Sequence, residues 1–274
     1  IYIDTIPAGS DFSTIANIQE RGGVSRAEFS FGHAIALANS LALAVPLTIA
    51  SRMPTLIRAV CTVTICVAVV FTVSRSGILA MMLAILLSLW VFSSAKLTVN
   101  AKALFIAAAC AAAYFVLPWI TGIFKASDIQ TEKSSDYRTQ LFHLCPYTKA
   151  FGLAPGYHED VRGRFSWQGL ESIDNAFLRV AVNFGWVPML LIVAIFAVSA
   201  ARVLLRSASP ADVSISAVAP GLLTVALITQ FGALTFFCNG VSALAYAERK
   251  SSTCNPEGTE SELANAGQRI QISQ

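Results

Sequence analysis

Residues 59–93 read AVCTVTICVAVVFTVSRSGILAMMLAILLSLWVFS, two apolar runs joined by the short polar link TVSRSG at 72–77. A helix needs about 20 mostly apolar residues to cross a hydrocarbon core of about 30 Å. Both runs are slightly short, so the helices are expected to extend into their flanks. The stretch therefore predicts two antiparallel membrane-spanning helices, near 59–74 and 77–93.

Apolar runs of similar length recur through the rest of the chain. Further membrane-spanning helices are expected near 33–50, 103–120, 180–201 and 215–237. The apolar stretch 238–247 is too short to cross alone, so it is either a half-helix or the end of a split last helix. The predicted fold class is therefore an all-α integral membrane protein with about six transmembrane helices.

The composition of the chain excludes several other classes of protein. Of its 274 residues, 55% are hydrophobic and 13% are charged, whereas soluble domains average about 25% charged. So low a charged fraction argues against a soluble enzyme, a secreted disulfide scaffold and a disordered chain. The 6 cysteines and 3 histidines are too scattered for a zinc site. With no phosphate-binding loop or basic–aromatic cluster, we expect no metal, no cofactor and no nucleic-acid partner.

The positions of the basic residues predict which way the helices face. The loops on one side of the membrane carry Arg52, Arg58, Lys96, Lys102, Arg202 and Arg206. Lys and Arg are enriched in cytoplasmic loops, so these loops are assigned to the cytoplasm. The other side then carries residues 1–32 and the loop 121–179, which is the only hydrophilic segment large enough to build a site.

These assignments divide the chain into five segments. An extracytoplasmic segment, 1–32, precedes four transmembrane helices in 33–120. The long extracytoplasmic loop 121–179 is expected to contain short interfacial helices. Two transmembrane helices and the possible half-helix occupy 180–247, and the polar tail 248–274 is expected to be disordered.

Three arginines lie on the extracytoplasmic side, against the usual distribution of charge. They are Arg26 in GGVSRAEFSFGHA, Arg75 in TVSRSG and Arg138 in SSDYRTQL. A guanidinium is permanently charged and matches phosphate oxygens with two parallel hydrogen bonds. Arg75 could instead simply reach the membrane interface, and Arg138 could pair with Asp136 or Glu132. If the fold brings the three together, they form an anion-binding site.

Four further residues are candidates for catalysis or substrate binding: Asp174, Asn175, His33 and Tyr157. A carboxylate at the outer surface, such as Asp174, could act as a base or a sugar ligand. Ser172 or Asp174 could equally cap the start of a helix. His33 opens the first span, where a histidine is more often a hydrogen-bonded packing residue than a catalyst. Tyr157 is one of the aromatic residues of the long loop.

Five short motifs, taken in order, resemble the O-antigen ligase and polymerase family of bacterial envelope glycan assembly. They are RAEFSFGHAI at 26–35, TVSRSG at 72–77, DYRTQL at 136–141, AFGLAPGY at 150–157 and IDNAFLRVAVNFGWV at 173–187. The resemblance covers about residues 20–200. Family members usually contain more spans, so the chain resembles the C-terminal half of such a protein, and the missing N-terminal helices are an expected partner.

The resemblance implies metal-independent glycosyl transfer at the outer face of the bacterial cytoplasmic membrane. A glycan on a polyprenyl diphosphate would pass to an acceptor hydroxyl, on a lipid A core for a ligase or on another lipid-linked glycan for a polymerase. By motif position, Arg75 and Arg138 correspond to the family's essential arginines, and Arg26 to the arginine ahead of the first span here. His33, Tyr157 and Asn175 are then further candidate ligands of the diphosphate or the glycan.

Two departures from the family pattern favour a polymerase over a ligase. Ligases usually carry His where this chain has Asp174, and many have His-Pro-Asn where this chain has HAI at 33–35. Polymerase-like and exopolysaccharide members more often show Asp-Asn. The ordinary pKa of an aspartate, about 3.9, makes Asp174 a weak base unless burial raises that pKa.

Two other functions stay open on the sequence. A component of a multi-span transporter or flippase would need charged or broken helices at mid-membrane. The predicted spans hold no acidic or basic residues away from their edges, and the Pro-Gly pair at 220–221 is the only obvious break. The other alternative is an inactive fragment or a non-catalytic scaffold.

Overall fold

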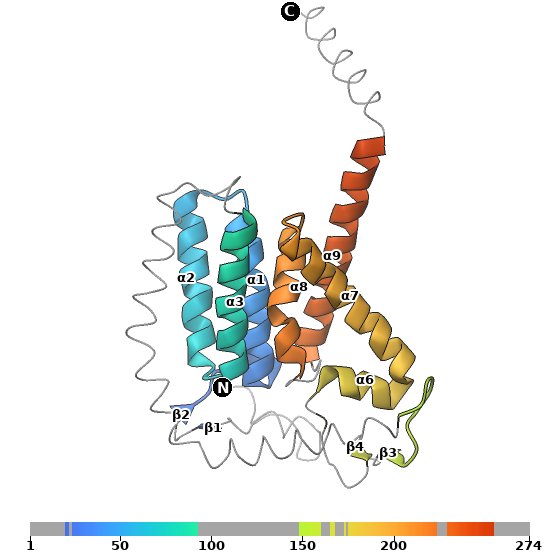
Figure 1. Ribbon diagram of the computed structural model, residues 1–274. Coiled ribbons are helices and arrows are strands. Elements are labelled where there is room, and N and C mark those ends of the chain that lie inside the picture. The colour runs from blue at the N-terminus through green and yellow to red at the C-terminus, as the bar shows by residue number, and fades with distance from the viewer. Residues whose placement is uncertain are drawn as a thin grey trace, which may run out of the picture.

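The computed structural model describes residues 20–21, 24–92, 148–159, 165–167, 173, 175–223 and 229–254. These residues are mostly helical, which confirms the helical class predicted from the apolar runs (Figure 1). The α-helices are α1 (Ala34–Ala50), α2 (Thr55–Phe71), α3 (Arg75–Phe92), α6 (Ala176–Phe184), α7 (Trp186–Leu204), α8 (Pro210–Val218) and α9 (Thr229–Cys254). Two 3₁₀ helices, η3 (Phe29–Phe31) and η5 (Ala219–Leu223), and two short antiparallel strand pairs complete the described fold: β1 (Glu20–Arg21) with β2 (Val24–Ser25), and β3 (Tyr157–Glu159) with β4 (Phe165–Trp167).

Helix α1 is the centre of the bundle, because it contacts α2, α3, α8 and α9. Its buried face is built from small residues, among them Ala36, Ala38 and Ala42, which are fully buried. Gly77 of α3 lies directly against Ala38, and a Cβ atom at Gly77 would overlap the Ala38 Cβ. The start of α3 therefore packs closely on α1, with only the Ala38 methyl group between the two backbones.

Three of the predicted spans coincide with observed helices. The spans expected near 33–50, 59–74 and 77–93 correspond to α1, α2 and α3. By length and apolar composition, α3 and α7 are the helices among the described residues that could cross a membrane, while α1 and α2 are shorter apolar helices. The predicted span 103–120 lies outside the described residues, so the count of six spans stays a prediction.

The other two predicted spans are each divided. The span 180–201 is interrupted at Gly185, whose φ of 102° is incompatible with a helix, so α6 ends before it and α7 begins after it. The span 215–237 becomes α8, then η5 at the Pro-Gly pair, then α9. Proline lacks the N–H that a continuing helix needs. The stretch 238–247 lies inside α9, which continues to Cys254 and so includes the first residues of the predicted tail; residues 255–274 lie outside the described part.

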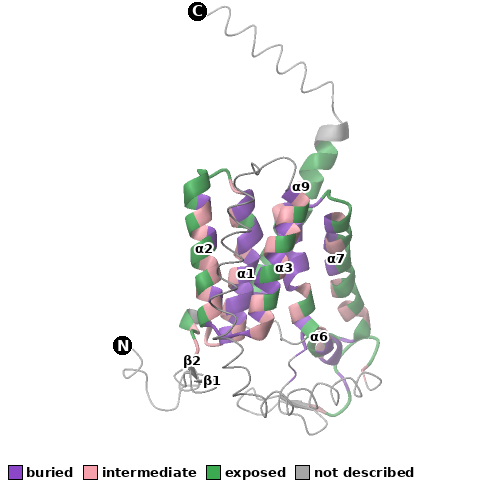
Figure 2. Cartoon of the chain, turned by 60° about the vertical axis from the view of Figure 1, so that its left-hand side comes forward, coloured by how far each residue is buried: buried purple, intermediate pink, exposed green. Residues whose placement is uncertain are grey.

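Much of the outer surface of the bundle is apolar. Figure 2 shows exposed residues along the outer sides of α2 and α7. Large apolar side chains among them include Leu56, Phe71 and Leu191, each at least 60% exposed. Exposed apolar side chains at this density are what a helix facing lipid requires.

One polar network ties α7, α8 and α9 together at the end where α8 begins. Arg202 lies 3.4 Å from the Asp212 carboxylate and 3.2 Å from the Ser242 hydroxyl, which also donates to Asp212. Ser209 and Asp212 form a capping box at the start of α8. Burial alone would raise the pKa of the Asp212 carboxyl. The hydrogen bonds from Ser242 and Ser209, with the Arg202 charge, hold that pKa below its usual value of 3.8 instead.

Candidate active site

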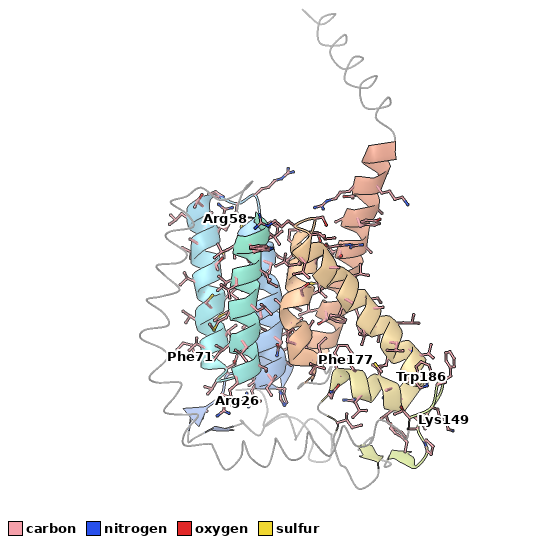
Figure 3. All side chains as sticks on the ribbon, in the orientation of Figure 1. Arg26, Arg58, Phe71, Lys149, Phe177 and Trp186 are labelled. Atoms are coloured by element: carbon pink, nitrogen blue, oxygen red, sulfur yellow. The ribbon has the colours of Figure 1, made fainter. Side chains whose placement is uncertain are left out.

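One end of the bundle collects the described residues that the sequence singled out. Because α1, α2 and α3 are antiparallel neighbours, α1 and α3 begin at the same end where α2 ends (Figure 1). This end, called the site end below, holds His33 before α1 and Arg75 at the first residue of α3. Figure 3 labels Arg26 at this end of the bundle, where α2 ends at Phe71.

Arg26 is anchored to the link between α2 and α3. Its Nε donates to the Thr72 carbonyl oxygen at 3.0 Å, and the neighbouring Ala27 N–H donates to the Phe71 carbonyl at 3.2 Å. These contacts join a segment that is 46 residues earlier in the chain to the residues just before Arg75. Arg26 and Arg75 therefore belong to the same small region of the fold, which the sequence alone left open.

The link itself has an unusual backbone. Val73 is fully buried and has a φ of 47°, a conformation that is strained for a β-branched residue. On its two sides, the Thr72 hydroxyl donates to the Val69 carbonyl at 2.6 Å, and the Ser74 hydroxyl accepts from the Gly77 N–H at 3.3 Å. The link thus holds the first turn of α3 in one fixed position.

Arg75 occupies the first residue of α3. The start of a helix carries a partial positive charge, and a cation placed there is disfavoured by about 0.3–1 kcal/mol. The same place favours an anion, because the free N–H groups and the helix dipole both point at it. Two arginines and a helix start at one place make this region well suited to a phosphate group.

His33 caps α1. Its Nδ1 accepts from the Ile35 N–H at 3.3 Å, which fixes the orientation of the ring at the helix start. This is the hydrogen-bonded packing role that the sequence analysis gave as the alternative to substrate binding. Its role as a ligand of the glycan stays a prediction.

Asn175 caps α6 in the same way. It is buried, and its Oδ1 accepts from the Leu178 N–H at 3.0 Å. From the sequence, Ser172 or Asp174 was the expected cap of this helix; the observed cap, Asn175, lies one residue after Asp174. The amide oxygen of Asn175 is therefore already used in the cap. The role of Asn175 in substrate binding stays a prediction.

The segment 149–154 is fastened to the junction of α6 and α7, which the sequence analysis did not foresee. The Gly152 and Ala154 N–H groups donate to carbonyls of α6, at 2.9 and 2.8 Å. In return, the first two N–H groups of α7 donate to the Lys149 and Ala150 carbonyls, at 2.9 and 3.2 Å. One segment thereby satisfies two carbonyl groups at the end of α6 and two N–H groups at the start of α7.

Gly185 makes this docking possible. A Cβ there would lie within 3.0 Å of the Ala150 carbonyl oxygen, and its φ of 102° is in the region that glycine alone adopts readily. Tyr157 follows the docked segment as the first residue of β3 and is half-buried. The only signals for this contact in the sequence are the glycines of the motifs 150–157 and 173–187.

The two parts of the chain meet near the site end. Helix η5 contacts both α3 and α6, so the helix that begins with Arg75 and the helix that Asn175 caps share a neighbour. Arg138 and Asp174 lie outside the described residues, and whether they join Arg26 and Arg75 stays a prediction. Within the described residues, no group of three or more His, Cys, Asp or Glu side chains could hold a metal ion.

Comparison with known proteins gives one match. The family model described as O-antigen ligase matches residues 60–193. No curated protein and no solved structure matches the chain. The matched range contains the candidates Arg75, Arg138, Tyr157, Asp174 and Asn175, whereas Arg26 and His33 precede it.

Proposed function

The match over residues 60–193 identifies this chain as a membrane protein of the O-antigen ligase family, and we propose that it is a polymerase-like glycosyltransferase. Membership implies glycosyl transfer of the ligase or polymerase type. The proposed donor is a glycan carried on a polyprenyl diphosphate, and the acceptor is a hydroxyl of another lipid-linked glycan. The proposed place of reaction is the outer face of the bacterial cytoplasmic membrane.

The observation that carries the proposal is the position of Arg75 at the start of α3, beside the link to which Arg26 is hydrogen-bonded. In the reaction, the bond between the sugar's anomeric carbon and the diphosphate oxygen breaks, and negative charge grows on the diphosphate. Fixed cations and helix N–H groups interact more strongly with this growing charge than with the ground state of the substrate, so they stabilise the transition state. This chemistry needs no metal ion.

The acceptor must lose a proton as its oxygen attacks the anomeric carbon. Asp174 is the proposed base, because it directly precedes the cap of α6 in the sequence and because a carboxylate can accept that proton. Its efficiency depends on an environment that raises its pKa from about 3.9 towards the working pH. The choice of polymerase over ligase rests on the Asp-Asn pair at 174–175 and on HAI at 33–35.

The test is polysaccharide formation in a deletion strain that carries the full-length protein with single substitutions. Arg75→Lys and Arg138→Lys keep the charge and lose the two-pronged hydrogen bonding of the guanidinium. Both are expected to abolish polymer at unchanged membrane levels. Arg179→Lys is the matched control, because Arg179 is exposed on α6, and it is expected to support normal polymer.

Two results would count against the proposal. Normal polymer with both Lys variants would mean that these arginines serve only topology. Failure of Arg179→Lys together with the others would point to a general need for arginine at this surface. Asp174→Asn tests the base separately from the cations. Loss of polymer at normal protein levels would support Asp174 as the base, whereas normal polymer would exclude Asp174 from that role.

A further inference from the structure

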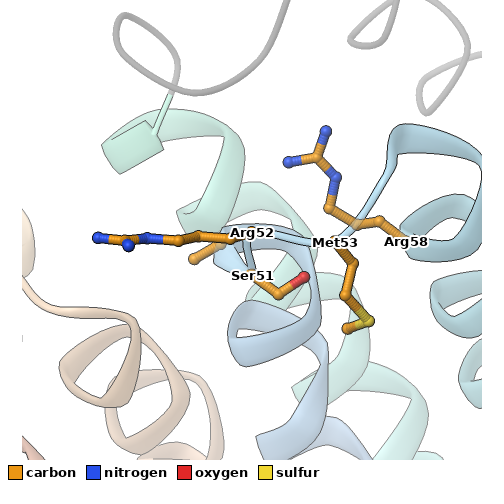
Figure 4. A pocket seen from close by; sticks show the side chains of 5 residues that line it. Ser51, Arg52, Met53 and Arg58 are labelled. Atoms are coloured by element: carbon orange, nitrogen blue, oxygen red, sulfur yellow. The ribbon is translucent and has the colours of Figure 1, made fainter.

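A cationic pocket lies at the opposite end of α1 from His33, at the loop that joins α1 to α2. It has a volume of about 310 Å³ and is lined by Ala50, Ser51, Arg52, Met53 and Arg58 (Figure 4). Helix α1 has 17 residues, which places this pocket about 25 Å from the site end. It is therefore separate from the candidate active site.

Arg58 is the central residue of this pocket, and it is only 8% exposed. Its Nη1 donates to the Ile49 carbonyl and its Nη2 to the Thr55 hydroxyl, both at 3.3 Å. Its Nε is buried and has no hydrogen-bond partner among the residues that the structure describes. A buried donor of a charged group is costly to leave without an acceptor.

The residues that line the pocket add a second positive charge and include no carboxylate. Arg52 lines the same pocket and is exposed, and residues 47–62 contain no Asp or Glu. Helix α2 begins after Pro54 with no side-chain cap and no acidic residue in its first turn, so its positive end also lies beside the loop. These features favour an anion.

A purely structural role explains only part of this arrangement. A cation that donates to the last carbonyls of α1 stabilises that helix end, and this accounts for the contact of Arg58 with Ile49. It does not account for the buried Nε, for Arg52 in the same pocket, or for the hollow between them. The ligand must supply an oxygen acceptor with negative charge.

We propose that this pocket binds a phosphate group, supplied by the head group of an anionic membrane lipid. The volume is at the small end of the range for ligand pockets, about 300–1,000 Å³, and suits a head group rather than a glycan. Beside the pocket, Leu56, Ile57 and Val60 of α2 are exposed by 75%, 48% and 56%. They offer the apolar surface that the acyl chains of such a lipid require, while a free phosphate ion would make no use of them.

The test is lipid binding to the purified full-length protein in nanodiscs, measured by native mass spectrometry. Phosphatidylglycerol is compared with phosphatidylcholine, and a parallel arm measures protection from thermal unfolding by inorganic phosphate. The variants are Arg58→Gln and Arg52→Gln; the exposed Arg52 gives a readout even if Arg58→Gln folds poorly. Arg249→Gln is the matched control, because it removes an exposed arginine of α9 that donates to the Ser207 carbonyl.

The proposal expects retention of phosphatidylglycerol to fall about tenfold in Arg58→Gln, as for a hydrogen bond to a charged group. A fall of about fivefold is expected in Arg52→Gln, as for one basic residue near an anionic head group. Arg249→Gln is expected to bind like the wild type. Equal retention of phosphatidylcholine, or no change in either pocket variant, would overturn the proposal. Protection by inorganic phosphate that both variants abolish would support the pocket and assign a soluble phosphate as its ligand.

Discussion

The contact between Gly77 and Ala38 fixes Arg75 in space, so adding one methyl group there is expected to damage both stability and activity. In Gly77→Ala the new Cβ would lie within 3.0 Å of the Ala38 Cβ, whereas ordinary contact begins at 3.4 Å. Helices α1 and α3 must therefore separate by at least the difference, 0.4 Å. Overpacking of this kind costs about 1–3 kcal/mol, partly offset by a gain of about 1 kcal/mol from replacing glycine within a helix.

The assays are thermal unfolding in detergent and polysaccharide formation in a deletion strain. Gly77→Ala is expected to unfold at a lower temperature and to make less polymer, because Arg75 is displaced and a 1 Å displacement of a catalytic group costs about 100-fold in rate. Gly240→Ala is the control, since nothing lies within 4 Å of a Cβ at Gly240. The pair Gly77→Ala with Ala38→Gly removes the overlapping atom and is expected to recover part of the loss. If Gly77→Ala behaves like the control, or if the loss in the double variant equals the sum of the two single losses, the contact with Ala38 does not position α3.

Three further changes test other parts of the fold. Gly185→Ala is expected to release the segment 149–154 and speed proteolysis there, because its Cβ would meet the Ala150 carbonyl at a φ of 102°; Gly152→Ala, in open space, should have a smaller effect. The pKa of Asp212 is lowered on folding, so the stability that it contributes is present above its usual pKa of 3.8 and is lost as the pH falls through the folded value. Asp212→Asn should remove that part of the acid sensitivity in a pH series of melting temperatures. Asn175→Ala is expected to cost about 1 kcal/mol as a lost cap, and Asn175→Asp to restore stability; if Asn175→Asp is stable but inactive, the amide has a role beyond the cap.

The apolar runs of the sequence were enough to predict the helices at the start of the bundle. Helices α1 and α3 fall within two residues of the predicted starts of their spans, because a long apolar run bounded by polar residues allows few other structures. The break at Gly185 could not be predicted in this way. The residues on both sides of it are apolar, and the break depends on Ala150, which is 35 residues earlier and meets it only in the folded chain.

The positions of the charged residues were enough to predict where the candidate site lies. The hydrogen bonds made by its residues could not be predicted in this way. Arg26 and Arg75 were identified because they oppose the usual distribution of positive charge, and the structure brings both to the link between α2 and α3. The capping roles of His33 and Asn175 depend on backbone angles that residue types do not specify. Arg58 was assigned only a topological role, because the residues beside it in the sequence do not indicate that its guanidinium is buried.

The proposed function depends most on the binding of a lipid-linked glycan's diphosphate by Arg75 and the start of α3. The most direct measurement is the affinity of the purified full-length protein in nanodiscs for a polyprenyl diphosphate and for the corresponding monophosphate. The wild type is expected to prefer the diphosphate, Arg75→Gln to lose this preference, and Arg179→Gln to keep it. An unchanged preference in Arg75→Gln would show that Arg75 does not bind the diphosphate.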